Sequence, residues 1–224
     1  MPRPRHIFLI LSLVFTSLHL SAQESEIKVV IRGGHKAAFG GYGAISVEGF
    51  HTCKDYFDIS GGAQYNSIGK TSAEARPAYF HDFSWGRLRA EALLTYTNLT
   101  AVNSIAAGAG VGISSRWIDI KAGYFYRIHA GRGGTIQEPF NIYYELCANL
   151  LPMIEDWDLQ LFITNSEIFE LERHYQPSFI AQCRYDLQNG VGISMGLGCK
   201  PAGIFNISAD YYESYLKLGI CYSW

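Results

Sequence analysis

The segment HDFS, residues 81–84, places a histidine and a serine close together. These two residue types can act as the general base and the nucleophile of a hydrolase when their side chains lie within hydrogen-bond reach. In a regular β-strand, residues three positions apart point to opposite faces, so His81 and Ser84 need a turn between them to form such a pair. The alternative is a loop that carries interfacial aromatic residues (Phe80, Phe83, Trp85).

A group of potential metal ligands lies in EIFELERHYQP, residues 167–177. Its Glu167, Glu170, Glu172 and His174 offer the carboxylate oxygens and the imidazole nitrogen that bind zinc and similar ions. Runs of this kind are mostly solvated faces of loops, and that is the interpretation we prefer. We therefore predict no metal here.

The stretch GRGG, residues 131–134, is glycine-rich. Loops of this type bind phosphate when they connect a strand to a helix, because the helix N-terminus then points at the anion. No such helix is predicted on either side of GRGG. The stretch predicts an exposed loop, and we expect no cofactor.

The remaining polar groups belong to segments in which apolar and polar residues alternate. In WIDIKAGYFYRIH, residues 117–129, Ile118 and Ile120 share one face whereas Asp119 and Lys121 share the other, the pattern of a β-strand with one apolar face. The same period runs through residues 54–67, 86–96, 105–113, 139–150, 157–163, 175–187, 191–199, 205–211 and 214–224, and a further strand fits near 27–32. The connections are rich in glycine, asparagine, aspartate and proline. The chain is predicted to be one all-β domain.

Such strands fit either a soluble sandwich or a transmembrane barrel. The alternation continues for about 10 to 13 residues, longer than the strands of soluble sheets and long enough to cross a bilayer when tilted. The polar faces mix charges of both signs, which would be a costly lining for a dry core. Aromatic residues cluster at the ends of the apolar faces, where a membrane interface would lie (Tyr65, Tyr96, Tyr124, Tyr126, Phe140, Trp157). These features favour a transmembrane antiparallel β-barrel.

The length of the chain sets the number of strands. About 200 mature residues, at roughly 16 per strand and turn, give about 12 strands within a range of about 10 to 14. Two registers remain possible. In one, residues 211–214 form the last outside loop, and the longer connections near 97–104, 129–138 and 165–173 lie on the periplasmic side. In the other, residues 212–214 are a bulge in a long final strand, a strand at 27–32 is added, and those connections lie outside.

The first 22 residues have the layout of a secretory signal peptide. A basic start at Arg3 and Arg5 precedes an apolar stretch from Ile7 to about Leu20, and cleavage is expected after Ala22. The predicted domains are thus a signal peptide, 1–22, and a barrel, 23–224. Charged residues make up 17% of the chain and its net charge is −2, so nucleic acid is not an expected partner. The five cysteines show no paired spacing and are predicted to be small apolar side chains within strands.

The final segment, SYLKLGICYSW, places Leu216, Leu218, Ile220, Tyr222 and Trp224 on one face. This segment resembles the closing strand of bacterial outer-membrane β-barrel proteins, in which the terminal aromatic residue is a signal read by the barrel assembly machinery. The cleavage region SAQ is also similar to those of Bacteroidetes outer-membrane proteins. The resemblance implies export to the outer membrane, contact with outer-membrane lipids and an assembly signal in the last residues (Leu218, Ile220, Tyr222, Trp224).

The alternation predicts that one set of charged side chains points into the barrel (Arg87, Arg89, Glu91, Asp119, Lys121, Arg127, Glu145, Asp158, Arg184, Asp210, Lys217). Charges in such a place must be hydrated or paired, because an isolated buried charge is costly. They therefore form either the lining of a pore or an ion-paired network that fills the interior.

Three functions follow from these observations. The first is a non-enzymatic pore for small solutes with a narrow polar lumen. The second is a structural or accessory barrel with a filled interior, in complex with other envelope proteins. The third is a lipid-modifying hydrolase of the outer membrane, although the HxSN-type motif of such enzymes is absent.

Overall fold

The computed structural model describes residues 24–37, 40–99, 102–151, 156–167, 170–171, 176–201 and 212–224. The strands of this part of the chain are β1 (Glu24–Lys36), β2 (Gly40–Lys54), β3 (Phe57–Asn66), β4 (Lys70–Phe83), β5 (Gly86–Leu99), β6 (Val102–Ser114), β7 (Ile118–Gly131), β8 (Gly134–Asn149), β9 (Trp157–Thr164), β10 (Ser166–Glu167), β11 (Glu170–Leu171), β12 (Ser178–Asp186), β13 (Val191–Lys200) and β14 (Glu213–Ser223). A short 3-10 turn, η1 (Gln188–Gly190), precedes β13. Within these ranges no helix has the length and apolar character needed to cross a membrane. The predicted signal peptide and the predicted strand at 205–211 lie outside the described residues.

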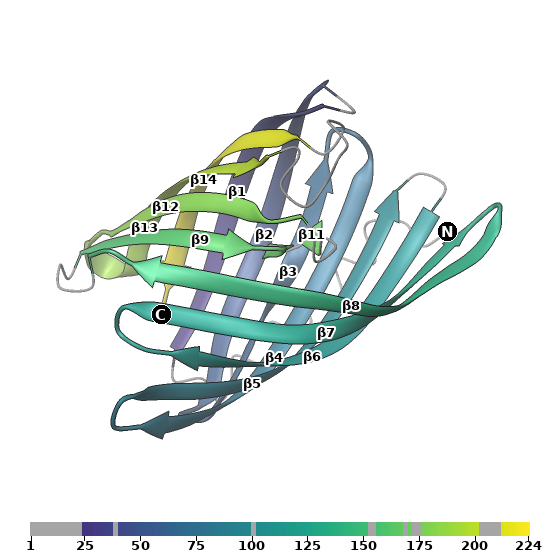
Figure 1. Cartoon of the computed structure of the whole chain (residues 1–224). Helices are drawn as coiled ribbons and strands as arrows, with labels where there is room; N and C mark the ends of the chain where they lie inside the picture. Colours follow the sequence, from purple (N-terminus) through teal and green to yellow (C-terminus); the bar gives the residue numbers. More distant parts are fainter. Residues whose placement is uncertain are drawn as a thin grey trace.

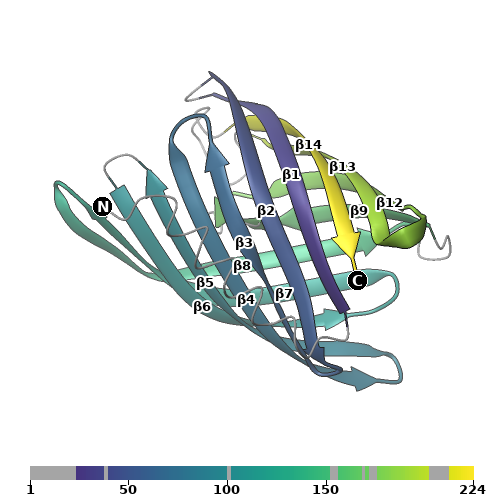
Figure 2. The ribbon, with the colours of Figure 1, turned by 180° about the vertical axis from the view of Figure 1, so that it is seen from behind.

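Twelve of the strands form a closed antiparallel barrel (Figure 1). Neighbours along the chain pair with each other, except that β9 pairs directly with β12, and the short β10 and β11 form a separate hairpin. The barrel closes where β14 pairs with β1, from Glu26 opposite Ser223 to Lys36 opposite Glu213. Figure 2 shows these two strands side by side from behind. The predicted fold class and strand number are confirmed.

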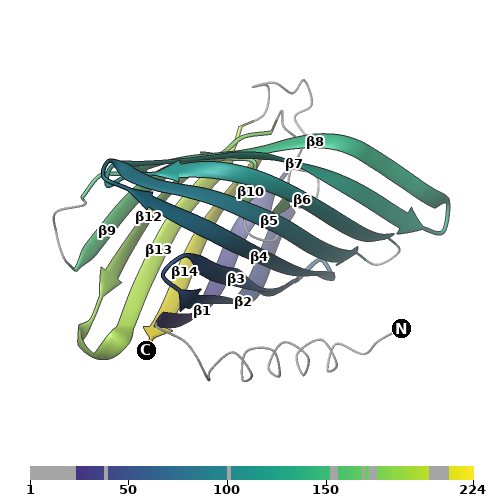
Figure 3. The same ribbon diagram turned by 90° about the horizontal axis from the view of Figure 1, so that it is seen from below.

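The two ends of the barrel carry different connections. At the terminal end, where β1 begins and β14 ends, the backbone groups of Ser25 and Trp224 exchange hydrogen bonds of 3.0 and 3.1 Å. The C-terminus lies beside the start of β1 in the view from below (Figure 3). Three connections at this end are short turns, at residues 55–56, 84–85 and 115–117. The opposite end, here called the loop end, carries the long connections 165–177 and 201–212.

This arrangement decides between the two predicted registers. β1 is present, and β13 pairs directly with β14, with Lys200 opposite Glu213. The strand predicted near 27–32 is therefore confirmed, and the longer connections lie at the end opposite the termini, as the second register expects. Its bulge at 212–214 is wrong, because β14 begins at Glu213 and Ser214 is paired within it. Most of the residues predicted as connections near 97–104 and 129–138 are strand, because β5 to β8 continue almost to their hairpin turns.

Two strands, β2 and β4, were not predicted from the alternation. The outward positions of β4 include Ala73, Ala75 and Pro77, whose small or rigid side chains give almost no hydrophobic signal. β2 begins with glycines and turns Phe50 toward the interior, which breaks the simple pattern. In both strands the pairing with neighbours imposes the extended conformation, since β propensity depends strongly on context.

The two faces of the wall differ sharply in polarity. Large apolar side chains cover the outer face, and Ile31, Val111 and Ile220 each expose more than half of their surface, at 62%, 66% and 63%. A soluble protein rarely exposes so large and continuous an apolar surface. Aromatic residues join it, among them Tyr65, Tyr124, Phe140 and Trp157. This outer face is suited to lipid, while most of the charged side chains of the strands lie inside.

Candidate functional site

The candidate site is a cavity of about 300 Å³ inside the barrel. Every barrel strand except β6 contributes to its wall, and so does β10. Its charged lining residues carry both signs (Lys28, Glu48, Arg76, Arg89, Lys121, Glu145, Glu167, Lys217). Uncharged polar residues lie among them (Ser60, Thr164, Ser166, Gln182, Ser194). The cavity is thus a polar compartment within an apolar-coated cylinder.

Ion pairs hold most of the charged side chains in the middle of the barrel. Glu74 and Arg76 alternate along the inner face of β4 and pair at 2.5 Å, and Arg89 pairs with Glu91 on β5 at 2.8 Å. Lys121 on β7 pairs with Glu145, directly opposite on β8, at 2.6 Å. Each charge is therefore compensated by a neighbour, which is the condition for keeping charges away from bulk water.

The chain turns into the barrel directly after β9. Asn165 uses its side chain to close the free edge of β8: its Oδ1 accepts from the Tyr144 amide and its Nδ2 donates to the Ile142 carbonyl, both at 2.8 Å. This substitutes for strand pairing, because β9 pairs only with the Glu145–Asn149 part of β8. The segment from Asn165 to Glu167, here called the inward segment, is buried.

Side chains from β4, β14 and β1 fasten the inward segment to the barrel wall. Arg76 Nη2 donates to the Ser166 carbonyl oxygen at 2.9 Å. Lys217 Nζ donates to Glu167 Oε1, and Arg32 lies 3.7 Å from the other oxygen of the same carboxylate. The inward segment thereby narrows the lumen beside the cavity.

A second charge cluster surrounds Glu213 near the loop end. The carboxylate of Glu213 lies 2.6 Å from Arg32, 3.2 Å from Lys200 and 3.4 Å from Lys36. Tyr42 also donates its hydroxyl to Glu213. Arg32 stacks its guanidinium over the Tyr215 ring at 3.6 Å from the centroid, so strands β1, β2, β13 and β14 are tied together at this level.

Apolar side chains fill the interior between β5 and β8. Leu93, Ala106, Phe125 and Tyr143 form a cluster in which no member is more than 2% exposed. The Tyr143 ring lies so close to Gly123 that a Cβ there would come within 2.4 Å of it. Its hydroxyl donates to Glu91 at 2.9 Å, which joins the apolar cluster to the charge network.

The predicted inward residues fall into three groups. Four of them line the cavity (Arg89, Lys121, Glu145, Lys217), and Glu91 lies buried beside Arg89. Others lie nearer the ends: Arg127 pairs with Glu138 at 3.5 Å, Arg184 pairs with Glu26 at 2.7 Å, and Arg87 pairs with Asp82 at the β4–β5 turn at 2.6 Å. Asp119 and Asp158 are half-buried on β7 and β9, and Asp210 lies outside the described residues. Their role as a pore lining stays a prediction.

Several of the central residues were not predicted. Glu74 and Arg76 lie on β4, which was not recognised as a strand because its outward side chains give little hydrophobic signal. Arg32 was missed because the strand near residues 27–32 was too short to show its inner face. Glu167 was assigned to a loop, and its burial depends on partners distant in sequence, which alternation does not report.

The other candidate motifs lie elsewhere. His81 packs edge-on against Phe83 with ring centroids 4.6 Å apart at the end of β4, and Ser84 lies in the turn that follows. Among the described residues no group of three or more metal-ligating side chains occurs, while Glu172 and His174 lie outside them. GRGG lies at the exposed β7–β8 hairpin turn. All five cysteines are free.

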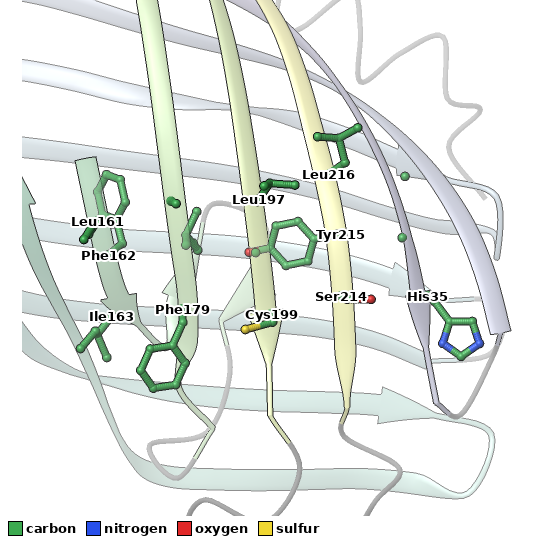
Figure 4. A pocket seen from close by; sticks show the side chains of 15 residues that line it. His35, Leu161, Phe162, Ile163, Phe179, Leu197, Cys199, Ser214, Tyr215 and Leu216 are labelled. Carbon is green, nitrogen blue, oxygen red and sulfur yellow. The ribbon is translucent and has the colours of Figure 1, made fainter. Parts of the chain in front are cut away.

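A second hollow, of about 840 Å³, crosses strands β9, β12, β13, β14 and β1 (Figure 4). Its lining includes Leu161, Ile163, Leu197 and Leu216, all of which belong to the exposed apolar set. Most of the hollow is therefore lined by the apolar wall, and Phe162 and Ile180 line both this hollow and the charged cavity.

Comparison with known proteins shows which solved structures have a similar fold. No protein-family model matches the chain, and a search of the curated proteins finds no relative. Among solved structures, the chain is similar to the KdgM porin in complex with disordered oligogalacturonate, with a TM-score of 0.57 and 9% identity over 88% of this chain and 99% of that one. It is also similar to the translocator domain of the autotransporter NalP from Neisseria meningitidis (0.55; 11%; 97% and 95%) and to the NanC porin (0.55; 9%; 87% and 98%). The chain has the fold of bacterial outer-membrane β-barrels.

Proposed function

We propose that the chain is a non-enzymatic protein of the bacterial outer membrane that forms a narrow channel for small polar solutes. The observation that carries the proposal is the charged cavity of about 300 Å³ inside a closed barrel whose outer face is apolar. Two of the similar structures are porins, which supports a channel. Because NalP has a similar barrel and a different task, the fold alone does not carry the function.

The inner wall suits polar solutes of small size. Most of its charges are compensated pairwise, so a solute meets strong local dipoles and no large uncompensated field. The inward segment and the ring of Tyr143 occupy part of the cross-section, which restricts the size of what passes. We therefore expect passage of monosaccharide-sized or amino-acid-sized solutes and exclusion of trisaccharides.

Reconstitution tests this function directly. Purified, folded protein in planar bilayers is expected to give stepwise ion conductance, and liposomes that contain it are expected to swell in erythritol but not in raffinose. Folding is checked by the heat-modifiable mobility that closed barrels show on gels. Folded protein that gives neither conductance nor swelling would overturn the proposal.

A second candidate is a structural or accessory barrel whose interior is filled. The buried cluster around Phe125, which is fully shielded from solvent, favours it. Co-extraction of a stoichiometric envelope partner together with absence of conductance would support this candidate over the channel. A conducting monomer would reject it.

We infer that the last strand directs assembly. Trp224 stacks on Tyr222 with centroids 5.8 Å apart, and its backbone completes the closure with Ser25. Deleting Trp224 is expected to lower the amount of folded protein in the outer membrane several-fold, because both the closure bonds and the aromatic signal are lost. Outer-membrane fractions compared with a Trp117→Ala control measure the effect, and equal amounts in both would contradict it.

A further inference from the structure

Two charged residues of the cavity wall differ from the others. Arg76, Arg89, Lys121 and Lys217 each lie in an ion pair with a carboxylate. In the part of the chain that the structure describes, Lys28 and Glu48 line the same cavity without an ion-pair partner. A free ammonium and a free carboxylate are thus presented to the lumen.

The two residues are neighbours across the β1–β2 pair, where Lys28 lies directly opposite Glu48. Side chains in such positions are about 5 Å apart at Cβ and ordinarily pair when their charges are opposite. Here they diverge. Lys28 crosses over Gly219 on β14, with its Cε 3.1 Å from the place a Cβ would occupy, and Glu48 accepts a hydrogen bond from the Ser46 hydroxyl at 3.0 Å.

Apolar surface lies beside the two charges. Val30 follows Lys28 on the inner face of β1, and Phe50 follows Glu48 on the inner face of β2. Phe50 is 37% exposed although its side chain points into a polar interior. An apolar ring open to water in this position offers a contact surface to the apolar part of a solute.

Resting on the proposed channel function, we propose that Lys28 and Glu48 form a binding site for zwitterionic solutes, namely α-amino acids with a small apolar side chain. Lys28 binds the α-carboxylate of the solute, Glu48 binds its α-ammonium group, and Phe50 contacts its side chain. A neutral sugar offers no charge to either residue, and a simple anion or cation satisfies only one of them.

Block of ion conductance tests the proposal, because a solute bound in a narrow lumen impedes ions. In bilayers with the wild-type protein, L-valine is expected to reduce conductance saturably. Isovalerate lacks the ammonium group and valinol lacks the carboxylate, so each can make only one of the two charge contacts. Each is expected to bind roughly fivefold more weakly than valine, because a charge contact that is partly open to water contributes modestly to binding. Erythritol is expected to produce no saturable block.

Variants of Lys28 and Glu48 test whether these two residues bind the solute. Lys28→Met and Glu48→Gln are each expected to weaken the valine block by roughly fivefold, and the double variant by little more, because each contact positions the other. The charge-exchanged variant Lys28→Glu with Glu48→Lys is expected to keep the block, with the solute reversed. The matched control, Arg87→Met with Asp82→Asn, removes one cation and one carboxylate at the terminal rim and is expected to keep the wild-type block.

The outcomes separate the two proposals. A wild-type barrel that conducts but shows equal block by valine, valinol and erythritol would overturn the amino-acid site and leave the channel standing. Valine block that survives in both single variants would also overturn it. A folded barrel without any conductance would overturn the channel and, with it, this site.

Discussion

The interior of the barrel has two parts of opposite character, here called the apolar half and the charged half. The apolar half is the cluster around Phe125 and Tyr143 on β5 to β8, which leaves almost no exposed surface although the Arg89 and Lys121 ion pairs lie on the same strands. On the side formed by β1, β2, β13 and β14, Arg32, Glu213 and Lys217 form charge pairs that extend toward the cavity. Apolar filling stabilises one shape of the barrel, whereas charge pairs can exchange partners with water or with a solute. The first half is therefore expected to govern stability and the second to govern passage.

Truncation of the apolar half is expected to have the largest effect on stability. Phe125→Ala removes a fully buried ring and should lower the free energy of unfolding by about 3–5 kcal/mol, through lost contacts and the cavity left behind. Urea unfolding in detergent, followed by tryptophan fluorescence, measures this change. Phe140→Ala, at a site 70% exposed to the surroundings of the barrel, is the control and should change the value by far less. Equal losses in the two variants would contradict the assignment of the apolar half.

Loss of the central carboxylate of the charged half is expected to have the next largest effect. Glu213→Gln removes the anion that Arg32, Lys36 and Lys200 share, which should cost about 3 kcal/mol, since removing one member of a buried charge cluster is strongly destabilising. The same variant should shift the ion selectivity of the channel toward anions, measured as the reversal potential in a salt gradient. An unchanged reversal potential would show that this cluster lies off the ion path.

Release of the inward segment is expected to affect passage more than stability. Glu167→Gln weakens the charge-assisted bond to Lys217 and should cost about 1.5–3 kcal/mol, while Asn165 and the Arg76 contact to Ser166 hold the rest of the segment. Conductance should rise, because the segment no longer narrows the lumen permanently. Single-channel recordings of this variant and of Phe125→Ala compare the two halves directly. A larger conductance change in Phe125→Ala would show that the apolar half, and not the charged half, governs passage.

The smallest effect is expected where a whole ion pair is replaced. Lys121→Met with Glu145→Gln removes both partners of a half-buried pair, and the unfolding free energy should change by less than about 1 kcal/mol. Lys121→Met alone leaves Glu145 without its pair and should cost more than the double variant. A double-mutant cycle of unfolding free energies measures this difference. Additive losses would show that the two side chains do not interact.

Much of the fold was predictable because alternation is a local property. The strand with Ile118 and Lys121 was recognised from its own residues, and it forms β7. β4 was not recognised, since its outer positions carry small side chains and Pro77. Its extended conformation comes from pairing with β3 and β5 on either side. The number of strands was predicted from the length of the chain alone. The prediction was therefore correct although two strands, β2 and β4, were not recognised.

The candidate site was predictable only in part. Arg89, Lys121, Glu145 and Lys217 were expected inside from their positions in alternating strands, and they line the cavity. Which charge pairs with which was not predictable, because partners such as Lys217 and Glu167 are far apart in the chain. The same holds for Lys28 and Glu48. That they have no ion-pair partner within the described ranges depends on the side-chain conformations of neighbouring residues.

The residues of each strand, read alone, were enough to predict a barrel with an apolar exterior and a charged interior, because side chains alternate between faces with a period of two. They were also enough to predict a closing strand that ends in Trp224. The path of the chain after β9, the narrowing of the lumen by Ser166 and Glu167, and the free pair of charges beside Phe50 required the closed barrel. These features arise from contacts between strands that are distant in sequence and adjacent only after closure, and such contacts leave no periodic trace in the chain.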